Sequence, residues 1–306
     1  MEEFSFSHIP LFNTLKRKIN VDDSMYHVAY EPPYDNWYHD LYNDLFYKNI
    51  VFKNNLSNGY YVEIGALDGV VNSQSFIFEK IFKWNGIIVE PHPIWYEKRM
   101  FLKQGEIDVT EVERIRMFRD CIVSNCAISN KTGKSVFECR KIHAYSGLKS
   151  NTSDSRKSDI EDEMLIETKT LIDLLDTYNS PDVIDWVAID TEGGEYDILS
   201  HYFKNNKKYK INLISFESGI FENMTNLLFD SQPYLKIRNP YLDFLKLSEE
   251  YGLVKFQPIT GEFFKSQYLD PPIENIDNLS DVDFEHYYIH KDYLEKNPNL
   301  EKFIIK

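Results

Sequence analysis

Residues 60–69 read YYVEIGALDG, and this stretch decides the fold. The apolar run 60–64 leads directly into a turn that contains two glycines, and glycine lets the chain turn sharply and lets a ligand approach the backbone closely. Apolar residues at helical spacing follow over 76–82, and residues 86–90 (GIIVE) repeat the apolar run. The order strand, glycine turn, helix, strand predicts a βαβ unit in a parallel sheet that is buried on both faces.

The same alternation continues along the chain and predicts a doubly wound α/β core. Further strands are predicted at 121–128, 134–139, 185–190 and 212–217, with two final strands, antiparallel to one another, at 253–257 and 286–289. One helix should begin after Thr170, which can cap it together with Asp173, and another at Pro240. The polar residues 149–163 are interpreted as a loop.

Residues 1–55 differ from the rest of the chain. They are aromatic and mixed in charge, with Pro32-Pro33 in the middle, and apolar residues at helical spacing over 38–46 predict a short helix. We therefore expect two parts, an N-terminal extension over 1–55 that packs on the core or roofs a pocket, and one domain over 56–306.

The composition argues against nucleic acid as a substrate. The 34 Lys and Arg residues face 49 Asp and Glu, which gives a net charge of −15. A protein that binds a phosphate backbone is instead rich in Lys and Arg side chains, which displace the counterions of the nucleic acid.

The cysteines and the apolar pattern indicate a cytoplasmic protein. Cys121, Cys126 and Cys139 are odd in number and lack zinc-like pairing, so neither a disulfide framework nor a structural metal is expected. The first residues, MEEFS, have no apolar run behind them, and no stretch approaches the ~20 apolar residues that cross a bilayer.

Polar residues cluster where the predicted strands end. In open α/β sheets, ligands bind outside the carboxyl ends of the strands. We expect the fold to gather the following residues at one edge: Glu63, Gly65 and Gly69 after the first strand, Glu90 after the second, 125–129 at the third, and Asp190, Glu192 and Glu217 after two later ones.

Glu90 and Glu63 indicate the kind of cofactor. Glu90 lies roughly twenty residues beyond the glycine turn, where nucleotide-binding folds place an acid that accepts both ribose hydroxyls. The G-x-x-x-G spacing differs from the G-x-G-x-x-G that a pyrophosphate needs. Glu63 suits a cationic ammonium group, such as that of S-adenosylmethionine. This favours S-adenosylmethionine over a nicotinamide cofactor; an NAD-dependent oxidoreductase and a non-catalytic interaction module that retains the fold are the alternatives.

Four motifs together resemble the FkbM-type methyltransferase family. They are YVEIGALDG at 61–69, VEP at 89–91, NCAIS at 125–129 followed by Gly133, and AIDTEGGE at 188–195, which contains the Asp-x-Glu-Gly signature. The resemblance covers about residues 58–220 and extends more weakly to the C-terminal strands. Asp68 stands where Asn is usual in the family and Gly194 where Ala is common. The N-terminal extension lies outside the resemblance, so the substrate does not carry over.

The resemblance implies a class I methyltransferase (Rossmann-like) fold, with a seven-stranded, mostly parallel sheet and helices on both faces. It also implies S-adenosylmethionine as cofactor and O-methylation of a hydroxyl on a sugar, glycan or related small molecule. The cofactor-binding set it implies is Glu63, Gly65, Ala66, Asp68, Gly69, Glu90, Asn125, Ala127 and Asp190. Glu63, Gly65 and Gly69 would surround the methionyl part, Glu90 the ribose, and Asn125 and Ala127 the adenine.

Asp190 is the first candidate for a general base, with His143 and Glu217 behind it, because a hydroxyl is a poor nucleophile at neutral pH. Asp190 could instead cap the following helix, and Glu192 and Glu195 could serve its dipole. The cluster of Asp190, Glu192 and Glu217 could also hold a divalent ion through hard oxygen ligands. We expect no metal, because methyl transfer needs no Lewis acid.

Overall fold

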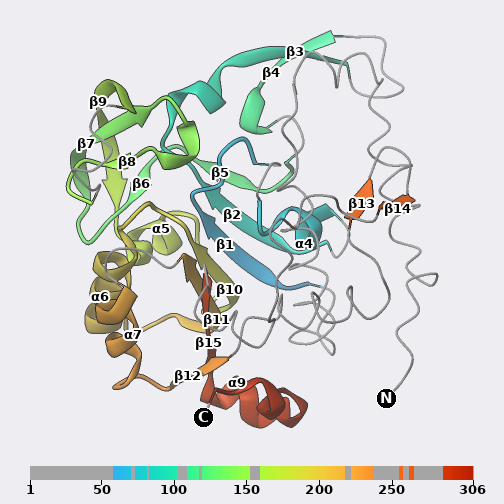
Figure 1. Ribbon diagram of the computed structural model, residues 1–306, viewed down its shortest axis with the longest axis vertical. Helices are drawn as coiled ribbons and strands as arrows, with labels where there is room; N and C mark the ends of the chain where they lie inside the picture. Colours follow the sequence, from blue (N-terminus) through green and yellow to red (C-terminus); the bar gives the residue numbers. More distant parts are fainter. Residues whose placement is uncertain are drawn as a thin grey trace.

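A computed structural model describes residues 58–69, 73–80, 83–102, 109–116, 119–151, 159–217, 222–237, 255–257, 262–264 and 285–305 (Figure 1). The N-terminal extension, the helix expected over 38–46 and the helix expected from Pro240 lie outside these residues.

A seven-stranded sheet forms the centre of the molecule (Figure 1). Its order is β12 (Tyr234–Ile237), β15 (Glu285–His290), β11 (Lys210–Glu217), β10 (Val183–Ile189), β1 (Tyr60–Ile64), β2 (Asn85–Val89) and β5 (Ile122–Ser124). The pairs from β11 to β5 are parallel, whereas β15 is antiparallel to both of its neighbours. The expectation is therefore met in part, since the sheet has seven strands but is mixed.

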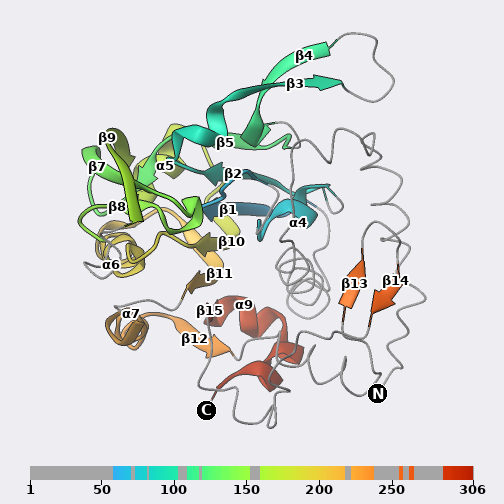
Figure 2. The same cartoon turned by 45° about the horizontal axis from the view of Figure 1, so that its top comes forward.

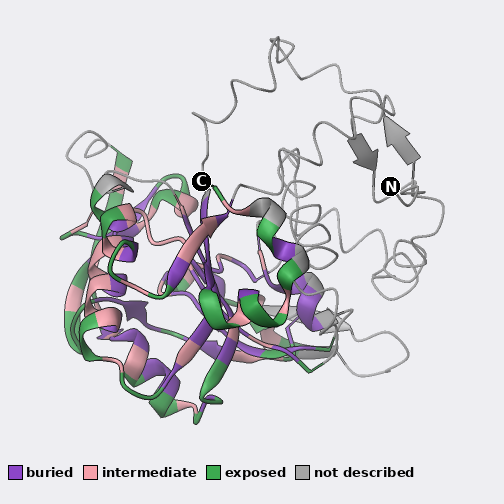
Figure 3. Ribbon diagram, turned by 90° about the horizontal axis from the view of Figure 1, so that it is seen from below, coloured by how far each residue is buried: buried purple, intermediate pink, exposed green. Residues whose placement is uncertain are grey.

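Helices cover both faces of this sheet because alternate strand residues bury on opposite sides. Val62 and Val187 pack with apolar residues of α5 (Leu171–Thr177), α6 (Glu195–Asn205) and α7 (Glu222–Phe229). Tyr61 and Trp186 pack with α4 (Phe76–Lys80), α9 (Lys291–Lys296) and the 3-10 helix η7 (Pro298–Phe303). Figure 3 shows the buried strands between these two layers. Within the described residues, no helix is long and apolar enough to span a bilayer.

Helix α5 begins as the sequence predicts. The Thr170 hydroxyl accepts a hydrogen bond of 3.0 Å from the Asp173 backbone N–H, which satisfies one donor that the helix itself leaves unpaired. Leu171, Leu174 and Leu175 are buried against the sheet.

A second, four-stranded sheet contains segments that the sequence reading assigned differently. Its order is β6 (Ala127–Ile128), β9 (Ile160–Lys169), β7 (Gly133–Arg140) and β8 (Gly147–Leu148). The single strand expected over 121–128 is wrong, because the chain leaves the main sheet after Ser124 and Ala127 pairs with Thr168 instead. The strand expected over 134–139 exists as β7, but it lies in this second sheet.

The loop expected over 149–163 is also partly wrong, because β9 begins at Ile160. Its charged residues point to solvent, while Met164 and Ile166 pack on a small core with Phe137. When half of the side chains of a strand are charged, its alternation of polar and apolar residues is easily mistaken for a polar loop in the sequence.

The expectation for the C-terminal strands needs correction. Residues 286–289 do form a main-sheet strand, β15, but its antiparallel partners are β11 and β12. β13 (Lys255–Gln257) pairs with β14 (Glu262–Phe264) as a separate hairpin. The four-residue β12 was not predicted, since a run this short carries little periodicity.

The connection from β2 to β5 contains a β-hairpin. The 3-10 helix η2 (Pro93–Tyr96) is followed by β3 (Lys98–Leu102), β4 (Val109–Glu113) and the 3-10 helix η3 (Arg114–Arg116). The β3–β4 hairpin extends away from the main sheet (Figure 2). Beyond η3, the chain returns to the sheet through Arg119.

Arg119 is completely buried and connects three segments near the glycine turn. Its guanidinium donates to the Glu79 carboxylate at 2.8 Å and to the Gly69 carbonyl at 2.9 Å. The same group also donates to three hydroxyls, those of Tyr61, Ser73 and Ser75. One cation thus holds β1, the end of the glycine turn and the start of α4 together.

Replacing Arg119 with Met should destabilise the protein by about 3–5 kcal/mol, because Glu79 would be left as an uncompensated buried charge. Urea unfolding followed by circular dichroism measures this change. Lys149→Met is the matched control, since Lys149 forms an ion pair with Glu163 in which both side chains are largely exposed. We expect its unfolding midpoint to stay near the wild-type value. Similar midpoints for both variants would contradict the role given to Arg119.

Candidate functional site

Five of the candidate residues lie in one row along the carboxyl edge of the parallel strands. The pairing of the parallel strands ends at Val89 opposite Ser124, Ile64 opposite Val89 and Ile189, and Ile189 opposite Phe216. One residue further along each strand, the row reads Asn125, Glu90, Gly65, Asp190 and Glu217. At the usual strand spacing of about 4.8 Å, the row is about 19 Å long. The sequence reading predicted this gathering.

The glycine turn after β1 lies in the middle of the row. Gly65 has φ 90°, and a Cβ built there would lie 1.9 Å from the carbonyl oxygen of Asp190. Gly69 also has a positive φ, 79°. A side chain at position 65 would therefore collide with the end of β10 in addition to straining the backbone. The turn also places Ala66 and Asp68, both buried, beside the row.

Glu90 is held rigidly at the end of β2. Its Oε2 accepts the Leu67 backbone N–H at 2.9 Å, and its Oε1 accepts the His92 backbone N–H at 2.7 Å. A carboxylate oxygen has two acceptor positions, so each oxygen of Glu90 can still accept one further donor. Burial raises the pKa of Glu90 to about 8; the two backbone donors oppose this shift, and Asp68 and Glu63 add to it.

The carboxylate of Glu63 is buried and accepts hydrogen bonds from residues 73–75 of the same chain. Its carboxylate accepts from the Ser73 hydroxyl, from the Gln74 backbone N–H at 2.7 Å and from the hydroxyl and N–H of Ser75. Arg119 lies 3.9 Å away. Glu63 therefore fixes the segment before α4 to the end of β1, and the ammonium contact expected of it stays a prediction.

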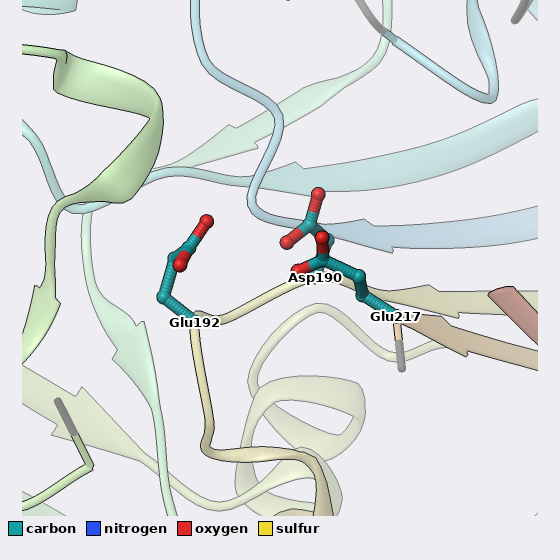
Figure 4. Close-up of side chains that lie close together, drawn as sticks. All are labelled: Asp190, Glu192 and Glu217. Carbon is teal, nitrogen blue, oxygen red and sulfur yellow. The ribbon is translucent and has the colours of Figure 1, made fainter. Parts of the chain in front are cut away.

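Three carboxylates meet at the other end of the row (Figure 4). Asp190 and Glu217 extend from the ends of β10 and β11, and Glu192 from the turn after β10. One oxygen of each lies within 4.8 Å of the others, and all three side chains are half-buried. This group can accept protons or bind a cation through oxygen.

The turn after Asp190 has its own hydrogen bonds. The N-cap residue of α6 is Gly194, so Asp190 is not at the capping position considered from the sequence. Glu195 instead accepts from the N–H and the hydroxyl of Thr191, which gives it a structural role. Glu192 has φ 58°, in the left-handed region.

His143, the second candidate for a base, lies on the second sheet in the 3-10 helix η4 (His143–Tyr145). Its ring centroid is 4.8 Å from that of His92 and 5.7 Å from that of Trp95. The second sheet also approaches the row at another point, since a Cβ at Gly193 would lie 2.8 Å from the Asn151 carbonyl oxygen. Ala127, expected near an adenine, is buried in β6.

The sequence reading missed the residues that hold the site in place. Arg119 and Glu79 belong to none of the four motifs, and 40 positions separate them, so no local spacing could have paired them. Gln74 was also missed; its side-chain oxygen accepts from Ser215 on β11 at 3.4 Å. The only signal was the run Ser73-Gln74-Ser75, which is polar at a point where the chain enters a buried helix.

Comparisons with known proteins give one local likeness. A stretch of 57 residues is 28% identical to the large ribosomal subunit protein uL22 of Ligilactobacillus salivarius (strain UCC118) and covers 19% of this chain. The chain spans half the length of that curated relative. A likeness this short and this low in identity shows no family.

No solved structure matches the chain significantly. The methyltransferase FkbM domain, by contrast, matches residues 63–238, which is more than half of the chain and contains the whole edge row. Each of the four motifs lies inside or at the border of this range. The chain therefore belongs to the FkbM methyltransferase domain family.

Proposed function

We propose that the chain is an S-adenosylmethionine-dependent O-methyltransferase with the class I strand arrangement, acting on a hydroxyl of a sugar, a glycan or a related small molecule. The observation that carries this proposal is the edge row. It brings a diol-binding carboxylate, a glycine turn and a candidate base into line along about 19 Å, in a chain of a methyltransferase family.

The residues of the row suit the cofactor. The free acceptor positions on the two oxygens of Glu90 match the two hydroxyls of a ribose. Gly65 and Gly69 allow the methionyl part to approach the backbone, and Asn125 and Ala127 would lie beside the adenine. Neither the glycine spacing nor the acids Glu63 and Asp68 suit a pyrophosphate, which disfavours the NAD-dependent alternative. The non-catalytic alternative would leave the aligned edge residues without a use.

The protein's share of the chemistry is alignment and proton removal. The cofactor supplies an activated methyl group, so the enzyme must hold the acceptor oxygen in line with the carbon–sulfur bond and exclude water. The oxygen–carbon bond forms while the carbon–sulfur bond breaks and its electron pair stays on sulfur. Asp190 would take the hydroxyl proton, and Glu217 beside it could share that proton.

The acceptor class rests on charge and family resemblance. The net charge of −15 would repel phosphates, so nucleic acid is disfavoured. The acids at the end of the row offer acceptors for hydroxyl donors, which suits a polyol.

Glu90→Ala should weaken S-adenosylhomocysteine binding by about 1.5–3 kcal/mol, the scale of hydrogen bonds to a charged group. Ribose hydroxyls donate to the ionised carboxylate, whose folded pKa is raised to about 8. Affinity of the wild type should therefore rise between pH 6 and 8, by up to about tenfold per unit, and then level off. Titration calorimetry across this range measures both effects.

Glu90→Gln is the control for the pH effect, because its amide does not titrate and its affinity should stay flat over the same range. An equal pH dependence in wild type and Glu90→Gln would mean that another group titrates. Unchanged affinity in a folded Glu90→Ala protein would remove Glu90 from the cofactor site.

Asp190→Asn should keep cofactor affinity but lower methyl transfer on the order of 10²-fold or more, as expected for a lost general base. Glu192→Gln is the matched control in the same cluster, and we expect a smaller loss there.

Methyl transfer should also persist in EDTA. Loss of transfer in EDTA with rescue by magnesium would instead assign the cluster to a metal ion.

The acceptor prediction is tested with radiolabelled S-adenosylmethionine and three acceptor pools: nucleotide sugars with oligosaccharides, RNA, and protein. We expect label in the sugar pool. Label that enters only RNA or protein would overturn the sugar assignment and leave the methyltransferase assignment intact.

Deleting residues 1–50 should impair acceptor use more than cofactor binding.

A further inference from the structure

Three aromatic rings pack together beside the cofactor-binding end of the row. His92 and Trp95 belong to the turn and 3-10 helix after β2, and His143 belongs to η4 on the second sheet. The ring centroids of His92 and His143 are 4.8 Å apart, those of Trp95 and His143 5.7 Å, and those of His92 and Trp95 6.4 Å. We call these three residues the ring cluster.

Each residue of the ring cluster has a buried nitrogen without a hydrogen-bond partner. These atoms are Nε2 of His92, Nε1 of Trp95 and Nδ1 of His143. His92 is 4% exposed and Trp95 8%. Buried polar groups in folded proteins are nearly always paired, so three unpaired nitrogens in one cluster indicate that a polar group binds there.

The hydrogen-bonding character of two of these atoms is fixed. Nδ1 of His92 accepts from the Ile94 backbone N–H at 3.3 Å, so the proton of the neutral ring lies on Nε2. Burial, and secondarily His143, lower the pKa of His92 to about 4, which keeps this ring neutral. Trp95 Nε1 can only donate. The cluster therefore presents two N–H donors and, at His143 Nδ1, a nitrogen that accepts in one tautomer.

A hydroxyl group complements these atoms, because its oxygen accepts two hydrogen bonds while its proton donates a third. An anion can only accept hydrogen bonds, so it would leave His143 Nδ1 without a donor in that tautomer. An anion would also lie near the negatively charged carboxylate of Glu90, which accepts a hydrogen bond from the His92 backbone N–H. Within the described residues, the possible metal-ligand group is the acidic one at Asp190, not this cluster.

We propose that His92, Trp95 and His143 bind a hydroxyl of the methyl acceptor other than the one that is methylated. This rests on the proposed function and deepens it. The cluster adjoins Glu90, and two strand spacings, about 10 Å, separate the ends of β2 and β10. An acceptor that reaches both the cluster and Asp190 must carry hydroxyls about that far apart, which favours an oligosaccharide over a small alcohol.

Entry of this hydroxyl requires movement of η4, because the three nitrogens are closed to solvent. The turn is suited to such movement. Ile142 is 58% exposed and Tyr145 41%, and no side chain caps the start of η4. His143 would therefore leave Trp95 and His92 when the acceptor enters, and close over its hydroxyl afterwards.

The experiment compares His92→Phe and His143→Phe with wild type in methyl transfer from labelled S-adenosylmethionine to the oligosaccharide pool. Phe keeps the ring packing and removes the nitrogens. We expect KM for the acceptor to rise about tenfold, the effect of one lost hydrogen bond. We expect kcat to stay within about threefold and S-adenosylhomocysteine affinity to stay unchanged. Ile142→Ala, on the same exposed turn but outside the cluster, should leave all three values near wild type.

A second readout is independent of turnover. In the protein loaded with S-adenosylhomocysteine, adding the oligosaccharide pool should shift the imidazole ¹⁵N resonances of His92 and His143. No shift, or an unchanged KM in both variants, would overturn the proposal.

The other outcomes assign the cluster elsewhere. Loss of cofactor affinity equal to the rise in KM would make the cluster part of the cofactor site. A fall in kcat with unchanged KM in His143→Phe would make His143 the base. The proposed function fails separately, if wild type neither binds S-adenosylhomocysteine nor methylates any hydroxyl.

Discussion

The buried guanidinium of Arg119 is the constraint on which the candidate site depends. It neutralises Glu79 and lies 3.9 Å from Glu63 in a region from which water is excluded. A buried charge without a partner would be far more costly than the packing around it could offset. The position of the glycine turn follows from this pairing, because Arg119 also binds the carbonyl of Gly69. The turn then meets Asp190 through Gly65.

The two ends of the edge row differ in their electrostatics. At the Glu90 end, the carboxylate of Glu90 is buried and held by two backbone donors, with the carboxylates of Asp68 and Glu63 nearby. At the Asp190 end, three half-buried carboxylates lie close together. The first arrangement suits a fixed, neutral diol. The second suits a proton in transit, because adjacent carboxylates raise one another's affinity for it.

The sequence was sufficient for the elements whose pattern is local. The strands at β1, β2, β10 and β11, the cap at Thr170 and the motifs at Glu90 and Asp190 depend on short runs of residues, and the structure has these elements where they were expected. The family assignment followed from the same runs.

The features that sequence reasoning missed depend on contacts between distant residues. The first residues of β9, 160–163, were assigned to a loop because three of these four residues are charged, and the apolar side of the strand, with Met164 and Ile166, becomes visible only when β7 pairs with it. Nothing in the sequence shows that Arg119 and the segment 73–75 surround Glu63, and the contact of Glu63 with a cofactor ammonium group stays a prediction. The FkbM resemblance does not supply these contacts, because it rests on the motifs alone and not on the residues that surround them in the fold.

The division into two sheets has a consequence for how this enzyme can change. Gly65 lies close to the Asp190 backbone, so the glycine turn and the strand that ends at Asp190 cannot vary independently. The second sheet contributes η4 through a short connection between β7 and β8. The hydrogen bonds described for Glu90 and Glu195 come from residues outside η4. A library that randomises η4 while fixing the edge row would therefore vary one member of the ring cluster, His143, beside a constant edge row, and natural descendants of this chain could diverge by the same route.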